Sequence, residues 1–190
     1  MGALTMIANR ILTAAVAAVW LVFLPVLPAA AQSAELDALF ERLQEPDLPD
    51  WELVEAEIWR HWSRSGSSAM DLLLQRGRTA LEAGDTAAAI EHFTALTDHA
   101  PDFAEGWNAR ATAYFHAGLY GPSVADIQRT LALNPRHFGA LSGFATILEA
   151  TGKPGDALDV WRAAQAIHPH SPGINEAVER LERLVSGTDL

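Results

Sequence analysis

Residues 104–137 read AEGWNARATAYFHAGLYGPSVADIQRTLALNPRH, and this stretch is the middle copy of a segment that occurs three times in succession. The first copy covers residues 70–103 and the third covers residues 138–171. The residues that recur every 34 positions include Pro101, Pro135 and Pro169, and Gly84, Gly118 and Gly152. Glycine suits the left-handed end of a helix, and proline stops a helix because it disfavours helical backbone in the residue before it. The period therefore predicts stacked copies of one helix–turn–helix unit.

Small and large side chains also recur at fixed places within the three copies. Position 8 holds Gly77, Ala111 and Ala145, and position 20 holds Ala89, Ser123 and Ala157. Position 4 holds Leu73, Trp107 and Leu141, and position 24 holds Phe93, Ile127 and Trp161. Small residues let two antiparallel helices approach where they cross, and the bulky residue at position 24 fills the gap between adjacent units.

This pattern resembles the tetratricopeptide repeat (TPR) family, whose period is 34 residues. The resemblance covers three copies of 34 residues, or 102 of the 190. It implies an all-α fold, a right-handed α-solenoid of TPR helix pairs with atypical helical caps. The predicted organisation is a signal peptide (1–31), a degenerate helical pair (32–69), the three repeats, and a C-terminal capping helix and tail (172–190).

The first 31 residues are typical of a secretory leader. Arg10 is the only charged residue among them, and an apolar run over 11–27 follows it. Pro28 and three alanines then precede Gln32, as at a signal-peptide cleavage site. We predict cleavage between Ala31 and Gln32; the alternative is an uncleaved anchor in the cytoplasmic membrane. The basic residues are almost all arginine and alanine is abundant, which indicates a GC-rich bacterial source and places the repeats in the periplasm in both cases.

The charge and the absence of cysteine exclude several classes of function. The formal charge of −11 becomes −12 when the leader and its single arginine are removed, which argues against binding nucleic acid or an anionic membrane surface. With no cysteine, the chain has neither disulfides nor thiolate chemistry. His168 with His170, and His92 with His99, do not supply three convergent metal ligands, and no serine lies in a nucleophile turn. We therefore expect no enzyme activity, cofactor, metal or small-molecule substrate.

The segments that flank the repeats are also helical in pattern. Apolar residues lie at i, i+3, i+4 and i+7 from Leu36, and Asp50 is placed to cap a second helix. We expect this pair to cover the exposed face of the first repeat, with His61, Trp59 and Trp62 packed against it rather than forming an aromatic cage. At the other end, the apolar residues expected to form the inner stripe of the capping helix are Val178, Leu181 and Leu184.

Arginine occupies position 7 of the first two copies, where the TPR family prefers an apolar residue. Arg76 and Arg110 can lay their methylene stems along apolar neighbours and lead their charged heads to solvent. Alternatively, each guanidinium pairs with a carboxylate of the preceding helix. The candidate partners are Glu91 or Asp98 for Arg110, and Glu55 or Glu57 for Arg76.

The resemblance implies a groove that binds extended or helical peptide segments through the first helix of each unit. The candidate groove residues are Arg78, Asn108, Thr112, Phe115, His116, Ser142 and Thr146. Some TPR proteins hold a terminal carboxylate with lysine, arginine and asparagine on this surface, but here only Arg78 and Asn108 could serve. We therefore expect a peptide anchored by one apolar side chain near Phe115. The alternative is a self-associating envelope-assembly or cell-wall biogenesis factor without a peptide ligand.

Overall fold

The structure is a computed structural model, and it describes residues 29–187. The described chain is all α-helical. Its helices are α1 (Ala29–Leu43), α2 (Trp51–Trp62), α3 (Ser68–Glu82), α4 (Thr86–His99), α5 (Ala104–His116), α6 (Tyr120–Leu133), α7 (Phe138–Ala150), α8 (Pro154–Ile167) and α9 (Pro172–Ser186). None of these helices combines the length and the apolar character that a membrane crossing needs. The predicted leader lies outside the described residues except for Ala29–Ala31, which open α1.

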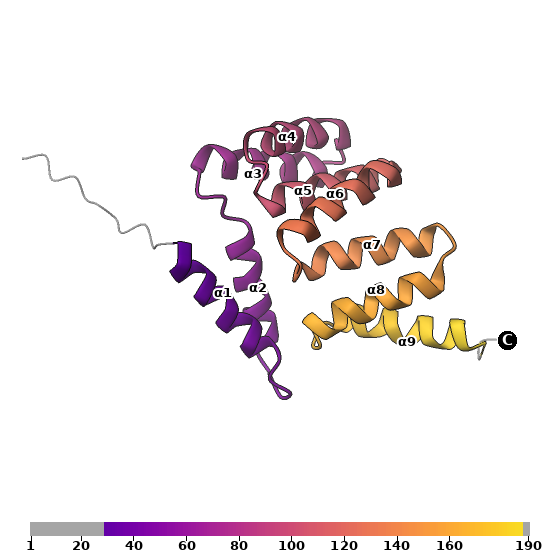
Figure 1. Ribbon diagram of the computed structural model, residues 1–190. Helices are drawn as coiled ribbons and strands as arrows, with labels where there is room; N and C mark the ends of the chain where they lie inside the picture. The colour runs from indigo at the N-terminus through magenta and orange to yellow at the C-terminus, as the bar shows by residue number, and fades with distance from the viewer. Residues whose placement is uncertain (1–28, 188–190) are drawn as a thin grey trace, which may run out of the picture.

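The three repeats form successive antiparallel pairs, α3 with α4, α5 with α6, and α7 with α8 (Figure 1). The first helix of each pair ends in the predicted glycine. Gly84, Gly118 and Gly152 have φ angles of 78°, 72° and 74°, which is the left-handed region. Beyond each glycine a backbone N–H reaches back to the last turn, as from Asp85 to the carbonyl of Ala80 at 2.9 Å. This hydrogen bond ends the helix and turns the chain into the second helix of the pair.

The small residues of the repeat lie where the helices cross, as the spacing predicts. A Cβ built on Gly77 would lie 2.3 Å from the ring of Phe93, so only glycine allows α3 and α4 to approach this closely. Ala89, Ala145 and Ala157 are likewise fully buried. Close approach of the helix backbones therefore contributes to the packing of the repeats as much as large side chains do.

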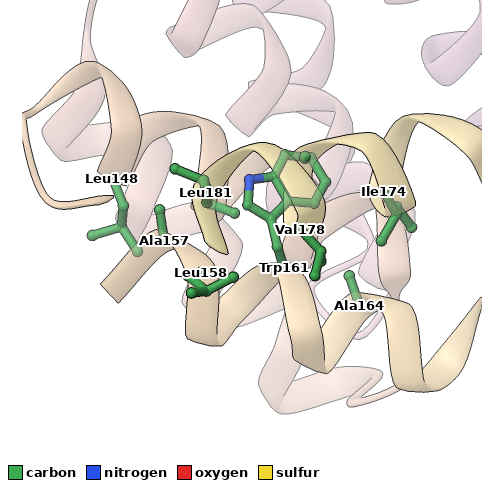
Figure 2. Close-up of a cluster of buried hydrophobic side chains, with 10 residues drawn as sticks. Leu148, Ala157, Leu158, Trp161, Ala164, Ile174, Val178 and Leu181 are labelled. Carbon is green, nitrogen blue, oxygen red and sulfur yellow. The ribbon is translucent and has the colours of Figure 1, made fainter. Parts of the chain in front are cut away.

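Helix α9 covers the end of the stack. Trp161, Leu158 and Ala164 of α8 face Ile174, Val178 and Leu181 of α9 in one apolar cluster (Figure 2). The expected stripe is correct for Val178 and Leu181 and wrong for Leu184, which is 51% exposed. Leu184 stays in solvent because no described element lies over the last turn of α9.

The N-terminal hairpin, α1 with α2, does not cover the first repeat as expected. It runs beside the turns that connect one repeat to the next, next to the start of α7 (Figure 1). The hairpin has its own apolar interior around Leu43, Val54 and Ile58, and Phe138 of the third repeat joins that cluster. Contacts between aromatic rings explain this position of the hairpin. The indoles of Trp59 and Trp62 find ring partners at the α6–α7 turn, whereas α3 contains no aromatic residue.

Two finer expectations about this hairpin are also wrong. His61 is turned towards α1, with its Nε2 3.6 Å from the Oε1 atom of Glu35, so it neither packs on the first repeat nor forms a cage. Asp50 lies at the N-cap of α2 but its side chain makes no capping hydrogen bond. Its carboxylate is instead paired with Arg42 of α1, which ties the two helices together.

Candidate functional site

A groove of about 240 Å³ lies between α5 and α7 on the inner side of the second and third repeats. We call it the α5–α7 groove. Its floor is apolar and includes Ala111, Ile127, Ala140 and Ile147, all buried. Its lining residues are Asn108, Ala111, Thr112, Phe115, His116, Ser123, Ile127, Gly139, Ala140, Gly143, Thr146 and Ile147. Those on α5 and α7 follow helical spacing, so each helix presents one continuous face to the groove.

Five of the seven predicted groove residues lie here. Asn108, Thr112, Phe115 and His116 come from α5, and Thr146 comes from α7. Phe115 is stacked on Tyr120 with their ring centroids 5.6 Å apart, which fixes its ring at one side of the groove. The hydroxyls of Thr112 and Thr146 donate to carbonyls one turn earlier in their own helices, at 3.0 and 2.8 Å. The rim is therefore polar but uncharged, apart from the imidazole of His116.

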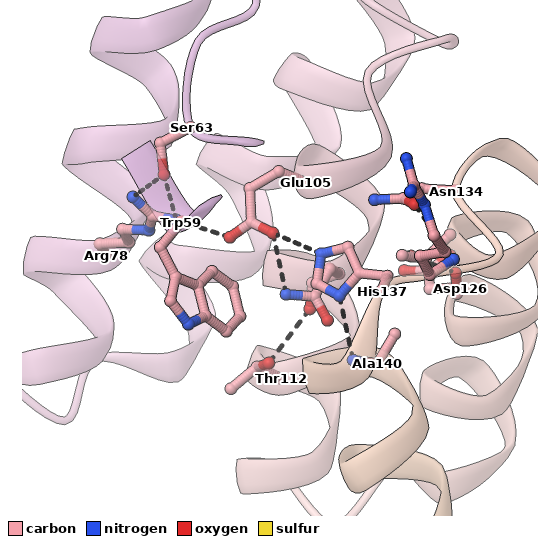
Figure 3. Close-up of polar contacts among 12 residues, drawn as sticks. Trp59, Ser63, Arg78, Glu105, Thr112, Asp126, Asn134, His137 and Ala140 are labelled. Carbon is pink, nitrogen blue, oxygen red and sulfur yellow. Dashed lines mark hydrogen bonds and ion pairs between the residues drawn. The ribbon is translucent and has the colours of Figure 1, made fainter. Parts of the chain in front are cut away.

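The other two predicted residues, Arg78 and Ser142, do not line this groove. Ser142 donates to the carbonyl of Phe138 at 2.9 Å, a bond within α7. Arg78 belongs to a buried polar group that also contains Glu105, Asn108 and His137, which we call the Glu105 cluster (Figure 3). Asn108 thus lines the groove and also belongs to this cluster, whereas Arg78 belongs to the cluster alone.

Glu105 is the centre of this cluster and is only 3% exposed. Its Oε1 accepts from Arg78 at 2.5 Å, and its Oε2 accepts from the amide of Asn108 at 3.0 Å. The Nδ1 atom of His137 accepts the backbone N–H of Ala140 at 3.1 Å. The neutral ring therefore carries its proton on Nε2 and donates it to Oε2 of Glu105, 3.0 Å away. A buried carboxylate that accepts from three donors in this way is part of a structural ion pair.

Because of these bonds, Arg78 and Asn108 are not free to hold the terminal carboxylate of a peptide. Arg78 is committed to Glu105 and also donates to Ser63 at 3.1 and 3.2 Å. The Asn108 amide is committed to the same glutamate. Glu105 was the missed residue, and a signal for it exists. An acidic residue at position 2 of one unit faces an arginine at position 9 of the preceding unit.

Arg110 is mostly buried and is paired with a carboxylate, but not with the predicted Glu91 or Asp98. Its Nε and Nη2 atoms donate to the carboxylate of Asp126 at 2.7 and 2.9 Å, and Nη1 donates to Thr97 at 2.9 Å. Asp126 belongs to α6 of the same repeat, so the carboxylate pairing is within one unit, and the hydrogen bonds that cross to α4 go to Thr94 and Thr97. The hydrogen bonds that Arg110 donates to Asp126 raise the pKa of the guanidinium above its ordinary value.

Arg76 behaves as the first alternative predicts and is exposed. Neither of its candidate partners is available to it. Glu57 is paired with Arg60 on α2, and Glu55 lies beside His168, whose imidazole lowers the pKa of that carboxyl. The two arginines at position 7 therefore have different environments, because α6 offers a carboxylate facing Arg110 and α2 does not pack against α3.

Among the described residues, one group of side chains could converge on a metal ion. Glu35, Glu57 and His61 place their ligand atoms within 4.8 Å of one another on the hairpin. Glu57 already has Arg60 as its partner, so this group is balanced without an ion. It is also separate from the α5–α7 groove.

Comparison with known proteins places this geometry in a family. The sequence model described as tetratricopeptide repeat matches residues 74–121. A TPR repeat-containing protein of Rhizobium etli is 37% identical over 153 residues, which is 80% of this chain and 75% of that protein. The chain belongs to the tetratricopeptide repeat family.

Solved structures show the same fold at low sequence identity. The Sgt2 TPR domain of Aspergillus fumigatus superposes with a TM-score of 0.60 at 18% identity, over 65% of this chain and 83% of that one. The first TPR domain of Spaghetti (RPAP3), bound to an HSP90 peptide, gives 0.59 at 20% identity, over 62% and 95%. The TPR2B domain of yeast Sti1, in complex with an Hsp70 peptide, gives 0.57 at 20% identity, over 62% and 99%.

Proposed function

We propose that this protein is a non-enzymatic scaffold of the bacterial cell envelope that binds a peptide segment of a partner protein in the α5–α7 groove. The observation that carries the proposal is the groove itself, which has an apolar floor, a polar uncharged rim and a volume of about 240 Å³. Small-molecule pockets are usually larger, at about 300–1,000 Å³. This groove is sized for one large apolar side chain, with the rest of the segment lying across the rim.

The structural neighbours support the peptide part of this proposal, since RPAP3 and Sti1 bind chaperone peptides. The Glu105 cluster argues for a different kind of peptide here. Because Arg78 and Asn108 are both bonded to Glu105, they are not free to hold a terminal carboxylate. The partner therefore contributes an internal segment with an apolar anchor, and its free C-terminus is not needed.

The compartment is part of the proposal and depends on the leader pattern in residues 1–31. The mature protein is expected to begin at Gln32 and to fractionate with the periplasm. N-terminal sequencing of the native protein checks this. A start at Met1 in a soluble cytoplasmic fraction would reject the compartment, and Met1 in the membrane pellet would favour the anchor.

The experiment for the groove fills it without touching the core. Thr112→Trp with Thr146→Trp adds two indoles to exposed rim positions, and Gln128→Trp adds one to the exposed outer face of α6 as the matched control. Each tagged protein is used to recover partners from envelope extract, followed by mass spectrometry. The groove variant should lose its partner by about tenfold or more, as at a binding hot spot, while the control recovers it fully. Equal recovery by both would reject the groove.

A second candidate is self-association, and the uncovered ends of the stack favour it. A shallow hollow over Leu72, Arg76 and Ala80 lies on the first repeat, where the hairpin was expected. At the other end, Leu184 and Val185 are exposed on α9. Light scattering over a range of concentrations separates the two candidates. A stable dimer that Leu184→Glu with Val185→Lys dissociates would favour assembly without a peptide ligand.

A further inference from the structure

The surface beneath α2 is continuous with the α5–α7 groove. Gly139 lines that groove, and a Cβ built on it would lie 2.6 Å from the Cη2 atom of Trp59. The indole of Trp59 therefore occupies the space that a side chain at Gly139 would need. A residue of the hairpin therefore lies against one of the residues that line the groove.

Helix α2 meets this surface in the way that a bound helical ligand would. Trp62 is stacked on His137, with ring centroids 4.1 Å apart and planes inclined by 17°. Trp59 presents its edge to His137 and to Phe138, each with a centroid distance of 5.5 Å. Next in the chain, Ser63 accepts hydrogen bonds from Arg78 of the Glu105 cluster. Two aromatic side chains one turn apart, followed by a hydroxyl, thus recognise this part of the concave face.

The contact between the hairpin and the repeats buries polar atoms that have no hydrogen-bond partner within the described part of the chain. Nε1 of Trp62 and both ring nitrogens of His168 are buried at it without a hydrogen-bond partner among the described residues. Oε2 of Glu55 lies 3.5 Å from His168 Nε2, too far for a strong hydrogen bond. Buried polar groups left in this state weaken an interface. The remaining polar ties, such as that between Asp37 and Arg136, are exposed.

The hairpin can therefore leave the repeats as a unit. Its interior around Leu43, Val54 and Ile58 is formed between α1 and α2, and Phe138 of the third repeat is the repeat residue buried in the same cluster. The linker over 63–67 contains Gly66, which has a φ angle of 84° and free space around it. Such a linker allows α2 to swing away without changing α3.

We propose that α2 is an internal ligand of the concave face, which a partner helix displaces by placing two aromatic side chains, one turn apart, on His137 and Gly139. This inference rests on the proposed function, since the displaced surface extends the α5–α7 groove. It adds that α2 covers the surface next to the groove at rest and that the partner carries an aromatic pair of the Trp59–Trp62 kind. Because α2 is covalently attached, it competes at a high effective concentration.

The test adds α2 to the protein as a separate peptide. The probe is a fluorescein-labelled synthetic peptide of residues 51–67, and its binding is followed by fluorescence anisotropy. The receiving proteins are the mature chain and a variant with Trp59→Ala and Trp62→Ala, in which the internal ligand is disarmed. The disarmed variant should bind the peptide at least about tenfold more tightly than the unmodified protein does. A peptide with both tryptophans replaced by alanine should not bind.

Adding Gly139→Ala to the disarmed variant provides the matched control for the surface. The new Cβ fills the space that Trp59 needs, so peptide binding should be lost while the helical circular dichroism is kept. Equal peptide binding by the unmodified and disarmed proteins, or no binding by either, would overturn the proposal. Failure of the disarmed variant to fold would also overturn it, because α2 would then belong to the repeat core.

Hydrogen exchange gives a second measurement on the unmodified chain. Amides of α2 should exchange through a local opening that leaves α4, α5 and α6 protected. Exchange of α2 only together with those helices would contradict a detachable ligand. None of these outcomes depends on the pulldown with Thr112→Trp and Thr146→Trp, so the internal ligand can fail while the groove function stands.

Discussion

At the residue scale, the buried pair of Arg110 and Asp126 makes the sharpest claim about stability. The two side chains are 13% and 7% exposed and share two hydrogen bonds. Arg110→Met keeps most of the stem volume but leaves Asp126 buried without its counter-charge. We expect the free energy of unfolding to fall by about 3–5 kcal/mol, measured by urea denaturation.

Arg129 provides the matched control for this prediction. It pairs with Asp102 at 3.4 Å, but both side chains are largely exposed. Arg129→Met should therefore change the free energy of unfolding by only about 0–1 kcal/mol. If Arg110→Met cost no more than Arg129→Met, the guanidinium of Arg110 would be solvated in solution and the buried pair would not exist there.

Sequence reasoning could locate these arginines but not their partners. Position 7 shows that Arg110 departs from an apolar pattern, and a buried charge needs a counter-charge. Which carboxylate pairs with Arg110 depends on how α5 is rotated about its axis between α4 and α6. Asp126 was not considered, and the exposed Glu91 and Asp98 were. For the same reason the sequence does not by itself assign Glu105 as the partner of Arg78.

At the scale of helices, two glycines of α7 test where the hairpin lies. Gly139→Ala places a methyl group 2.6 Å from the indole of Trp59, so α2 must shift and the protein should lose stability. Gly143→Ala meets only the Cδ1 atom of Ile127, at 3.8 Å. It should raise the free energy of unfolding by about 0.5–1 kcal/mol, since alanine is the better helix former. Urea denaturation measures the free energy of unfolding of both variants. Equal changes in the two would mean that α2 does not contact Gly139.

The tie between α7 and α9 predicts a dependence on pH. Glu149 accepts from Arg180 at 2.6 and 3.1 Å and from Trp161 at 2.8 Å. The hydrogen bonds from Arg180 are the largest cause that lowers the pKa of Glu149 from its ordinary value of 4.5. The folded-state pKa is therefore the lower one. The stabilisation is complete above pH 4.5 and is lost as the pH falls through the folded-state value.

Glu149→Gln removes this charge at nearly constant volume. At pH 7 the variant should be less stable by about 1 kcal/mol or less, because Arg180 is half exposed and the pair is screened. The difference should shrink as the pH is lowered below 4.5. Thermal unfolding of both proteins from neutral to acidic pH measures it. A difference that stays constant with pH would show that the carboxylate charge has no part in holding α9.

The helices of the repeats were predictable from sequence, and the placement of the hairpin was not. The glycine and proline period fixes where each repeat helix starts and stops, and those signals act within one turn of the chain. Where α2 lies depends on long-range contacts of Trp59 and Trp62 with His137 and Phe138. Those two residues lie in a turn more than 70 positions away, and no local pattern links them to α2.

At the scale of the whole molecule, the stack of three repeats presents one groove whose chemistry differs from that of a carboxylate-holding TPR domain. Its floor is apolar, and the arginine nearest to it is bonded to a buried glutamate. Helical spacing within the repeats brings five of the seven candidate residues to this groove. The contact of Trp59 with Gly139 at its edge could not be predicted, because it depends on where α2 packs.

The most direct test of the central claim is the affinity of groove-selected peptides measured by fluorescence anisotropy. Peptides are selected from a displayed library on the unmodified protein and counter-selected on the variant with Thr112→Trp and Thr146→Trp. Each is synthesised with a free and with an amidated C-terminus. We predict that both forms bind alike, that replacing one apolar residue by alanine costs about tenfold or more, and that Gln128→Trp binds normally. Peptides that need a free C-terminal carboxylate, or that bind the filled variant equally well, would contradict an apolar-anchored groove.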